Sequence, residues 1–164
     1  MSATPSSDLE VVNICERALG MAPEAYPPTL PSAPELLGAP AWYGFEHAAW
    51  ALGEDVRQAF SRTPRLKSDP AVVSKVVEVA TCRNLRRGRQ SFITALGFVA
   101  ASGHASRLAQ FLGDPDVDGQ VVSTLLKMKA AGFSGQVRSL TNSKQTWIRR
   151  LAQRYLERYP PDAV

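Results

Sequence analysis

The sequence contains few cysteines and lacks the segments that direct a protein into or through a membrane. Two cysteines, Cys15 and Cys82, lie far apart among 164 residues, which excludes a secreted scaffold built on disulfides. No apolar run exceeds a few residues, whereas a membrane-spanning helix needs about twenty. The first residues carry neither the basic start nor the apolar stretch of a secretory signal. These absences favour a reduced, cytoplasmic protein without a membrane partner.

The usual signatures of catalysis are also missing. His47 and His104 are the only histidines, and neither has a second ligand at metal spacing. The sequence has no glycine-rich phosphate loop with its lysine and no Gly-x-Ser-x-Gly turn. Asp114, Asp116 and Asp118 lack the glycine and terminal glutamate of a calcium loop, so we expect them to cap a helix. We therefore expect no bound metal, no cofactor and no enzymatic activity.

Charge is divided unevenly along a chain that is otherwise typical of one globular domain. The composition, 45% hydrophobic and 21% charged, is sufficient for a single core. Residues 1–82 hold 6 lysines and arginines against 10 acidic residues, and residues 83–164 hold 13 against 5. A basic half of this size can attract phosphates or an acidic protein surface.

The N-terminal 40 residues predict one helix followed by an irregular connector. Residues 8–19 form the helix, with Gly20 placed to end it in a left-handed conformation. Its expected apolar face is Leu9, Val12, Cys15, Ala18 and Leu19. Six prolines between residues 22 and 40 exclude a long helix there. Because Tyr26, Leu30 and Leu36 are interleaved with these prolines, we expect the connector to pack on the domain of residues 41–164.

From residue 41 onward the apolar spacing is helical throughout, so the fold class is all-α. A first helix ends near Gly53, and a short second one carries Val56 and Phe60. The sequence Ser68-Asp69-Pro70 starts a valine-rich helix, because a capping side chain precedes a proline. A turn at Arg87-Gly88 precedes a helix with few charges, which we expect to be the most buried.

The last sixty residues contain a repeat of a short helix, a break and a longer helix. The breaks at Gly103 and Gly132 are twenty-nine residues apart, and the same shift superimposes Leu108 on Val137. With one inserted residue, the longer helices also align at Val117 with Trp147, Val121 with Leu151, and Leu125 with Tyr155. A helix pair of this length cannot bury its own apolar face and must stack on its neighbours.

Two stretches of this repeat resemble the HEAT-like helical repeat family. The run Leu-x-x-Phe-Leu-x-Asp-Pro-Asp-Val at residues 108–117 resembles the family's inter-helix turn, particularly in short bacterial members. The run Trp-Ile-Arg-Arg-Leu-Ala-Gln-Arg-Tyr-Leu at residues 147–156 resembles its Val-Arg-x-x-Ala-x-x-x-Leu helix. The resemblance covers residues 87–159 and is weaker over 41–86. It implies an α-solenoid of three or four helix pairs, in which Arg149 pairs with neighbouring repeats.

The candidate partner-binding residues are arginines in two groups. The first surrounds the predicted turn and the second follows one stripe of the last helix: Arg83, Arg86, Arg87 and Arg89, then Arg150, Arg154 and Arg158. Arg89 also falls on the apolar side of its helix and is expected to be partly buried. Replacing Arg86 and Arg87 with glutamate should leave the melting temperature nearly unchanged. We expect Trp147 to anchor the core.

The resemblance implies a non-enzymatic, protein-binding solenoid, of the kind that includes immunity proteins neutralising bacterial toxins. In that case either the basic half faces an acidic toxin, or the acidic half covers a basic nuclease. The alternative is a nucleic-acid-binding protein similar to the alkylpurine DNA glycosylases with HEAT-like repeats. The chain is short for that family and shows no assembled Trp/Asp/Arg pocket. A chromophore lyase also resembles the repeat, but a suitable pocket residue is lacking.

Overall fold

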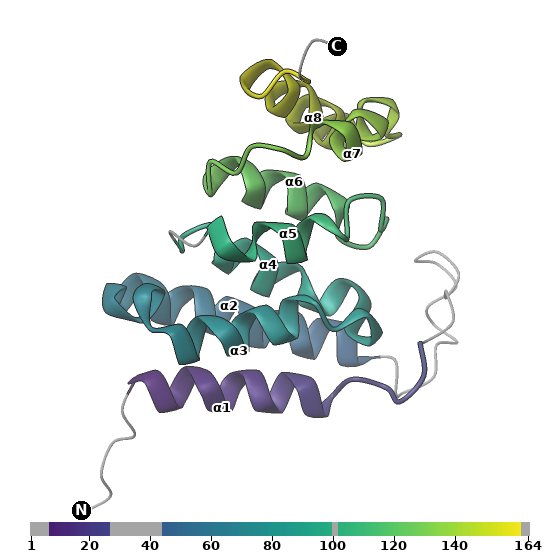
Figure 1. Ribbon diagram of the computed structural model, residues 1–164. Helices are drawn as coiled ribbons and strands as arrows, with labels where there is room; N and C mark the ends of the chain where they lie inside the picture. Colours follow the sequence, from purple (N-terminus) through teal and green to yellow (C-terminus); the bar gives the residue numbers. More distant parts are fainter. Residues whose placement is uncertain (1–6, 27–43, 100–101, 162–164) are drawn as a thin grey trace, which may run out of the picture.

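The computed structural model describes residues 7–26, 44–99 and 102–161, and every regular element in these ranges is a helix. The helices follow one another in layers, from α1 at one end of the molecule to α8 at the other (Figure 1). The α-helices are α1 (Ser7–Gly20), α2 (Phe45–Arg62), α3 (Pro70–Ala80), α4 (Gln90–Leu96), α5 (Ala105–Ala109), α6 (Asp118–Lys127), α7 (Ser134–Arg138) and α8 (Thr146–Arg158). The 3-10 helices are η3 (Pro64–Ser68), η4 (Arg83–Arg89), η5 (Ser102–His104) and η6 (Ser139–Asn142). The all-α prediction is confirmed.

Helix α1 is confirmed, but its buried face differs from the predicted one. Val11 and Ile14 are buried with Cys15 and Ala18, whereas Leu9 remains 50% exposed. The face is rotated because α1 packs against α2 and α3 together. Gly20 is the last residue of the helix and does not adopt a positive φ, contrary to the prediction. Most of the predicted connector, residues 27–40, lies outside the described residues.

The predicted break at Gly53 is wrong, because α2 continues through it as one helix of 18 residues. This glycine allows α2 and α4 to approach closely. A Cβ atom at Gly53 would lie 1.9 Å from Ser91 Oγ and 2.8 Å from Phe92 Cδ2. Ser91 also donates a hydrogen bond of 2.7 Å to the Trp50 carbonyl oxygen on α2. The glycine at position 53 is therefore explained by the close packing of α2 against α4 and not by the end of a helix.

Two other predicted signals are confirmed. Asp69 caps α3, since its carboxylate accepts hydrogen bonds from the backbone N–H groups of Ala71 and Val72. The short helix α4 buries Phe92, Ile93 and Leu96. It packs against α2, α3 and α6, so it lies at the centre of a continuous hydrophobic core.

The repeat unit is present as two helix pairs, α5 with α6 and α7 with α8. Of the two predicted breaks, Gly132 has a φ of +102°, a conformation that a side chain would strain, whereas Gly103 lies in η5 without a positive φ. The left-handed glycine between α5 and α6 is Gly113, with a φ of +105°. Leu108 and Val137, which the shift of twenty-nine superimposes, are both fully buried. Helix α6 packs between α4 and α8 and so connects the last pair to the rest of the core. Within the described ranges, none of the helices has the length and hydropathy of a bilayer crossing.

Candidate functional site

The first arginine group lies on η4, where the backbone turns sharply between α3 and α4. Arg86 has φ 49° and ψ −123°, a conformation that costs free energy for a residue with a side chain. This turn directs the side chains of Arg86 and Arg89 inward. Arg86 is 7% exposed and Arg89 is completely buried. Two of the four arginines predicted to contact a partner therefore lie inside the molecule. The burial expected for Arg89 is confirmed, whereas Arg86 was expected at the surface.

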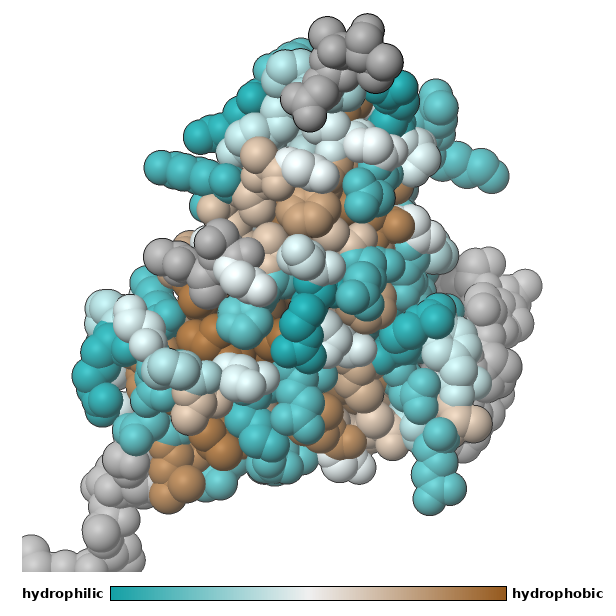
Figure 2. All heavy atoms as spheres, in the orientation of Figure 1, coloured by the Kyte–Doolittle hydropathy of each residue, from teal (hydrophilic) through white to brown (hydrophobic). Residues whose placement is uncertain are grey.

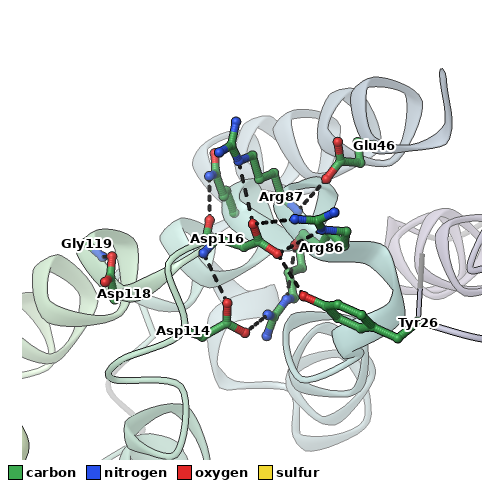
Figure 3. A network of polar contacts seen from close by, with 10 residues as sticks. Tyr26, Glu46, Arg86, Arg87, Asp114, Asp116, Asp118 and Gly119 are labelled. Carbon is green, nitrogen blue, oxygen red and sulfur yellow. Dashed lines mark hydrogen bonds and ion pairs between the residues drawn. The ribbon is translucent and has the colours of Figure 1, made fainter. Parts of the chain in front are cut away.

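Arg86 forms a two-pronged ion pair with Asp116, which precedes α6 (Figure 3). Its Nε lies 3.1 Å from Asp116 Oδ2 and its Nη2 lies 3.3 Å from Oδ1. The Tyr26 hydroxyl donates a hydrogen bond of 3.3 Å to the same Oδ2 atom. Arg87 Nε is 3.7 Å from Oδ1. Asp116 thus connects residues that are 30 and 90 positions away in the chain.

Arg89 forms a second buried pair beside the first. Its Nη2 donates a hydrogen bond of 2.5 Å to Asp114 Oδ2, and its Nε donates one to the carbonyl oxygen of Arg86. The guanidinium carbon lies 4.6 Å from the centre of the Phe111 ring. Asp114 Oδ1 accepts the backbone N–H of Asp116, which fixes the two carboxylates relative to each other. These contacts join η4 to the turn before α6.

Asp114 and Asp116 therefore do not act mainly as helix caps, which corrects the prediction from the sequence. Val117 is the residue before α6 and forms no capping hydrogen bond, whereas the Asp118 carboxylate in the first turn accepts one of 2.7 Å from the backbone N–H of Gly119. Removing a carboxylate from water is costly unless a partner compensates it. Asp114 and Asp116 meet that cost through Arg89 and Arg86. We do not propose Arg86 and Arg89 again as partner contacts, because their guanidinium groups are held inside the molecule.

The network makes the charge of Asp116 part of the folded structure. Burial alone raises the pKa of this carboxyl. Hydrogen bonds and charge from Arg86, with contributions from Tyr26 and Arg87, outweigh burial and hold the pKa below its ordinary value of 3.8. At Asp118, burial raises the pKa, and the negative charges of Asp114 and Asp116 raise it further. Folding therefore makes Asp116 harder to protonate and Asp118 easier to protonate than an ordinary aspartate.

We expect Asp116 to make the protein sensitive to acid. A carboxyl group with a depressed pKa in the folded state stabilises the fold above its unfolded pKa, and this contribution is lost as the pH falls. Urea unfolding should show wild-type stability falling below about pH 5. Asp116→Asn should lower stability at neutral pH and flatten this fall, with Asp118→Asn as a control that does not flatten it. Parallel pH profiles for Asp116→Asn and wild type would contradict this assignment.

Arg83 and Arg87 are the members of the first group that reach the surface. Arg83 lies over the Tyr26 ring, 5.5 Å from its centre, and the Arg87 side chain is 68% exposed. The backbone N–H of Arg87 donates a hydrogen bond to Glu46 on α2, so the residue is anchored by its main chain. The two side chains provide exposed positive charge beside the buried network.

The second group, on α8, is entirely exposed. Arg150, Arg154 and Arg158 lie on the surface, and none forms an ion pair with an acidic residue in the described part of the chain. Figure 2 shows hydrophobic side chains gathered most densely over the lower layers, and long hydrophilic side chains that project from both the upper and the lower parts. The predicted solvated stripe is thus present.

Trp147 is not the core anchor that the sequence predicted, because its side chain is 44% exposed. Val117, its counterpart in the preceding repeat, is completely buried. Helix α6 is enclosed by α4 and α8, whereas no element in the described ranges covers the corresponding flank of α8. Ile148, Ala152 and Tyr155 form the buried face of α8 instead.

Trp147 helps to form a shallow surface groove along α8. The groove is lined by Thr146, Trp147, Arg150, Leu151 and Arg154. One edge of the indole packs against Gly119, where a Cβ atom would lie 2.2 Å from the ring. Sequence reasoning identified Arg150 and Arg154 but missed the groove. The one feature of the sequence that could have indicated the groove is the placement of Trp147 and Leu151 beside the arginine stripe.

Other polar residues that could be considered for a functional site have structural roles instead. Arg149 donates hydrogen bonds to the carbonyl oxygens of Ser143 and Lys144 and to the Thr146 hydroxyl, so it stabilises its own turn and not a neighbouring repeat. Burial raises the pKa of the Cys15 thiol to about 12, which keeps it protonated. No group of three or more metal-ligating side chains gathers within residues 7–26, 44–99 and 102–161.

Comparisons with protein-family models, curated proteins and solved structures found no match to this chain. The resemblance to HEAT-like repeats thus remains a prediction from residues 108–117 and 147–156.

Proposed function

We propose that this protein is a non-enzymatic, protein-binding α-solenoid of HEAT-like helix pairs that recognises an acidic partner. The supporting observation is the surface of α8, where Arg150, Arg154 and Arg158 are exposed and form no ion pair with an acidic residue in the described ranges. Arg150 and Arg154 also line a groove with the exposed Trp147. The exposed Arg83 and Arg87 extend the proposed contact surface. Layers stacked in chain order suit this role, because helical repeats present extended faces to partners.

The composition of this surface favours a protein partner. Tryptophan and arginine are enriched at the energetic centres of protein interfaces, since both combine a large contact area with polar groups. Exposed like charges repel one another, and an acidic partner would remove that repulsion on binding. Neutralisation of a bacterial toxin by direct binding is the specific form of this function that the resemblance suggests.

Nucleic acid is the second candidate, and the observation favouring it is the same unpaired arginine stripe. Three cations along one helix would also attract phosphates. The two candidates differ in salt dependence and sequence preference. A nucleic-acid binder would bind any duplex, with an affinity that falls steeply as salt increases.

The proposal is tested by affinity capture with the full chain and two charge-matched variants. Arg150→Glu/Arg154→Glu changes the α8 surface, and Arg62→Glu/Arg107→Glu makes the same change in net charge at exposed arginines elsewhere. We expect wild type and the control to retain an acidic protein from source-cell extract. The α8 variant should lose it while unfolding at the same urea concentration. Tight binding of duplex DNA at physiological salt, with no protein retained, would replace this function with the second candidate.

A further inference from the structure

Helix α8 presents two parallel rows of side chains on one flank. Trp147 and Leu151 form an apolar row, and Arg150 and Arg154 begin a basic row that continues to Arg158. Members of each row are four residues apart, which is about 6 Å along a helix. An apolar strip bordered by regularly spaced cations is thus present on one element.

We propose that this flank binds an acidic amphipathic helix of the partner, a conclusion that depends on the proposed protein-binding function. Rows of side chains four residues apart on two helices interdigitate in the commonest class of helix packing. Carboxylates at positions i and i+4 of a partner helix lie about 6 Å apart along its axis, which matches the spacing of Arg150 and Arg154. An apolar side chain beside those carboxylates would fill the groove between Trp147 and Leu151.

The groove is held in shape before any partner arrives. The Trp147 Nε1–H donates a hydrogen bond of 2.7 Å to Gln145 Oε1, and the far edge of the ring rests on Gly119. Arg149 fixes the preceding turn through a hydrogen bond of 2.7 Å to the Ser143 carbonyl oxygen. A side chain that is already fixed loses little conformational freedom on binding, so more of the contact free energy contributes to affinity.

Charge and apolar surface together favour an acidic helix over nucleic acid. Arginines alone would suit either phosphates or carboxylates. Leu151, which is half-buried beside Trp147, provides an aliphatic surface that an apolar side chain can cover. A phosphate backbone would leave this apolar row exposed to water. An acidic amphipathic helix pairs with the basic row and covers the apolar row in a single contact.

The test uses three synthetic, alanine-based helical peptides that differ only at two positions. The first carries Glu at i and i+4 with a leucine on the same face, the second carries Gln at those positions, and the third carries Lys. Binding to the full chain is measured by fluorescence anisotropy of labelled peptides. We expect the Glu peptide to bind about tenfold more tightly than the Gln peptide, as two exposed charge pairs would give.

Charge reversal should invert this preference. Arg150→Glu/Arg154→Glu should bind the Lys peptide and lose the Glu peptide, while Arg62→Glu/Arg107→Glu should behave as wild type. Trp147→Ala should weaken the Glu peptide about tenfold or more, as expected for an aromatic anchor. Urea unfolding of each variant separates loss of binding from loss of folding. If Trp147→Ala unfolds, Trp147→Phe keeps the packing on Gly119 and should bind at intermediate strength.

Some outcomes would overturn the inference but not the proposed function. Equal affinity for all three peptides would exclude an acidic helix at this flank. Capture of an acidic protein through Arg83 and Arg87 would then keep the protein-binding function at another surface. A further outcome is that single-stranded DNA displaces the Glu peptide and itself requires Arg150 and Arg154 for binding. In that case the flank is a nucleic-acid site and the inference fails. Inversion of charge preference without any captured protein would support the helix site and count against the wider function.

Discussion

Arg86→Ala should lower the free energy of unfolding by about 3–5 kcal/mol, because it leaves the buried carboxylate of Asp116 without its main partner. Arg86 and Asp116 are 7% and 3% exposed, so water cannot readily replace the lost contacts. The substitution also removes the two hydrogen bonds that connect η4 with the turn before α6. Urea unfolding followed by circular dichroism measures the loss.

Arg87→Ala is the matched control, since the two arginines are adjacent in the chain. Arg87 is exposed and lies 3.7 Å from the same carboxylate, so its removal should cost less than about 1 kcal/mol. The burial of Arg86 and its ion pair with Asp116 are the reasons to expect this contrast, in place of the expectation from the sequence that both arginines can be reversed without loss of stability. Equal losses for the two variants would mean that the buried pair of Arg86 and Asp116 does not stabilise the contact between η4 and the turn before α6.

Gly53→Ala should lower the free energy of unfolding by about 3 kcal/mol, although alanine is normally the better helix former. The added methyl would lie 2.7 Å from Ser91 Cβ and 2.8 Å from Phe92 Cδ2. These atoms belong to Ser91 and Phe92 of α4, which are both buried and cannot move without opening the core. The helices α2 and α4 must separate to admit the methyl group, which thermal and urea unfolding would detect.

Two companion variants identify the cause of this loss. Ser91→Gly in the Gly53→Ala background removes the nearest side chain and should restore part of the stability. Gly135→Ala in α7 adds a methyl where no atom lies within 4 Å, so it should be neutral or slightly stabilising. A Gly53→Ala variant as stable as wild type would show that the close approach of α2 and α4 is not required.

Local signals in the sequence determined the class of the fold and several boundaries. Asp69 followed by Pro70 specifies a helix start through hydrogen bonds and backbone angles within a few residues. The repeat was recognisable because Gly103 and Gly132 are twenty-nine residues apart, as are Leu108 and Val137, which are both buried. The stripe Arg150, Arg154 and Arg158 follows from helical periodicity alone. Each of these features depends on neighbours in the chain.

Tertiary structure decided the remaining features, because their causes lie far away in the chain. Arg86 was expected at the surface until the turn before α6 brought Asp116 to it. The burial of Arg89 was expected from its helix face, but its partner Asp114 was not. Gly53 resembled a helix end because the sequence does not reveal that Ser91 would lie against it. The periodicity of α8 placed Trp147 near its apolar face, but burial requires a neighbouring element to cover that flank. Ion pairs, close contacts between helices and the burial of a helix face each depend on two elements, and local sequence patterns do not specify which elements will meet.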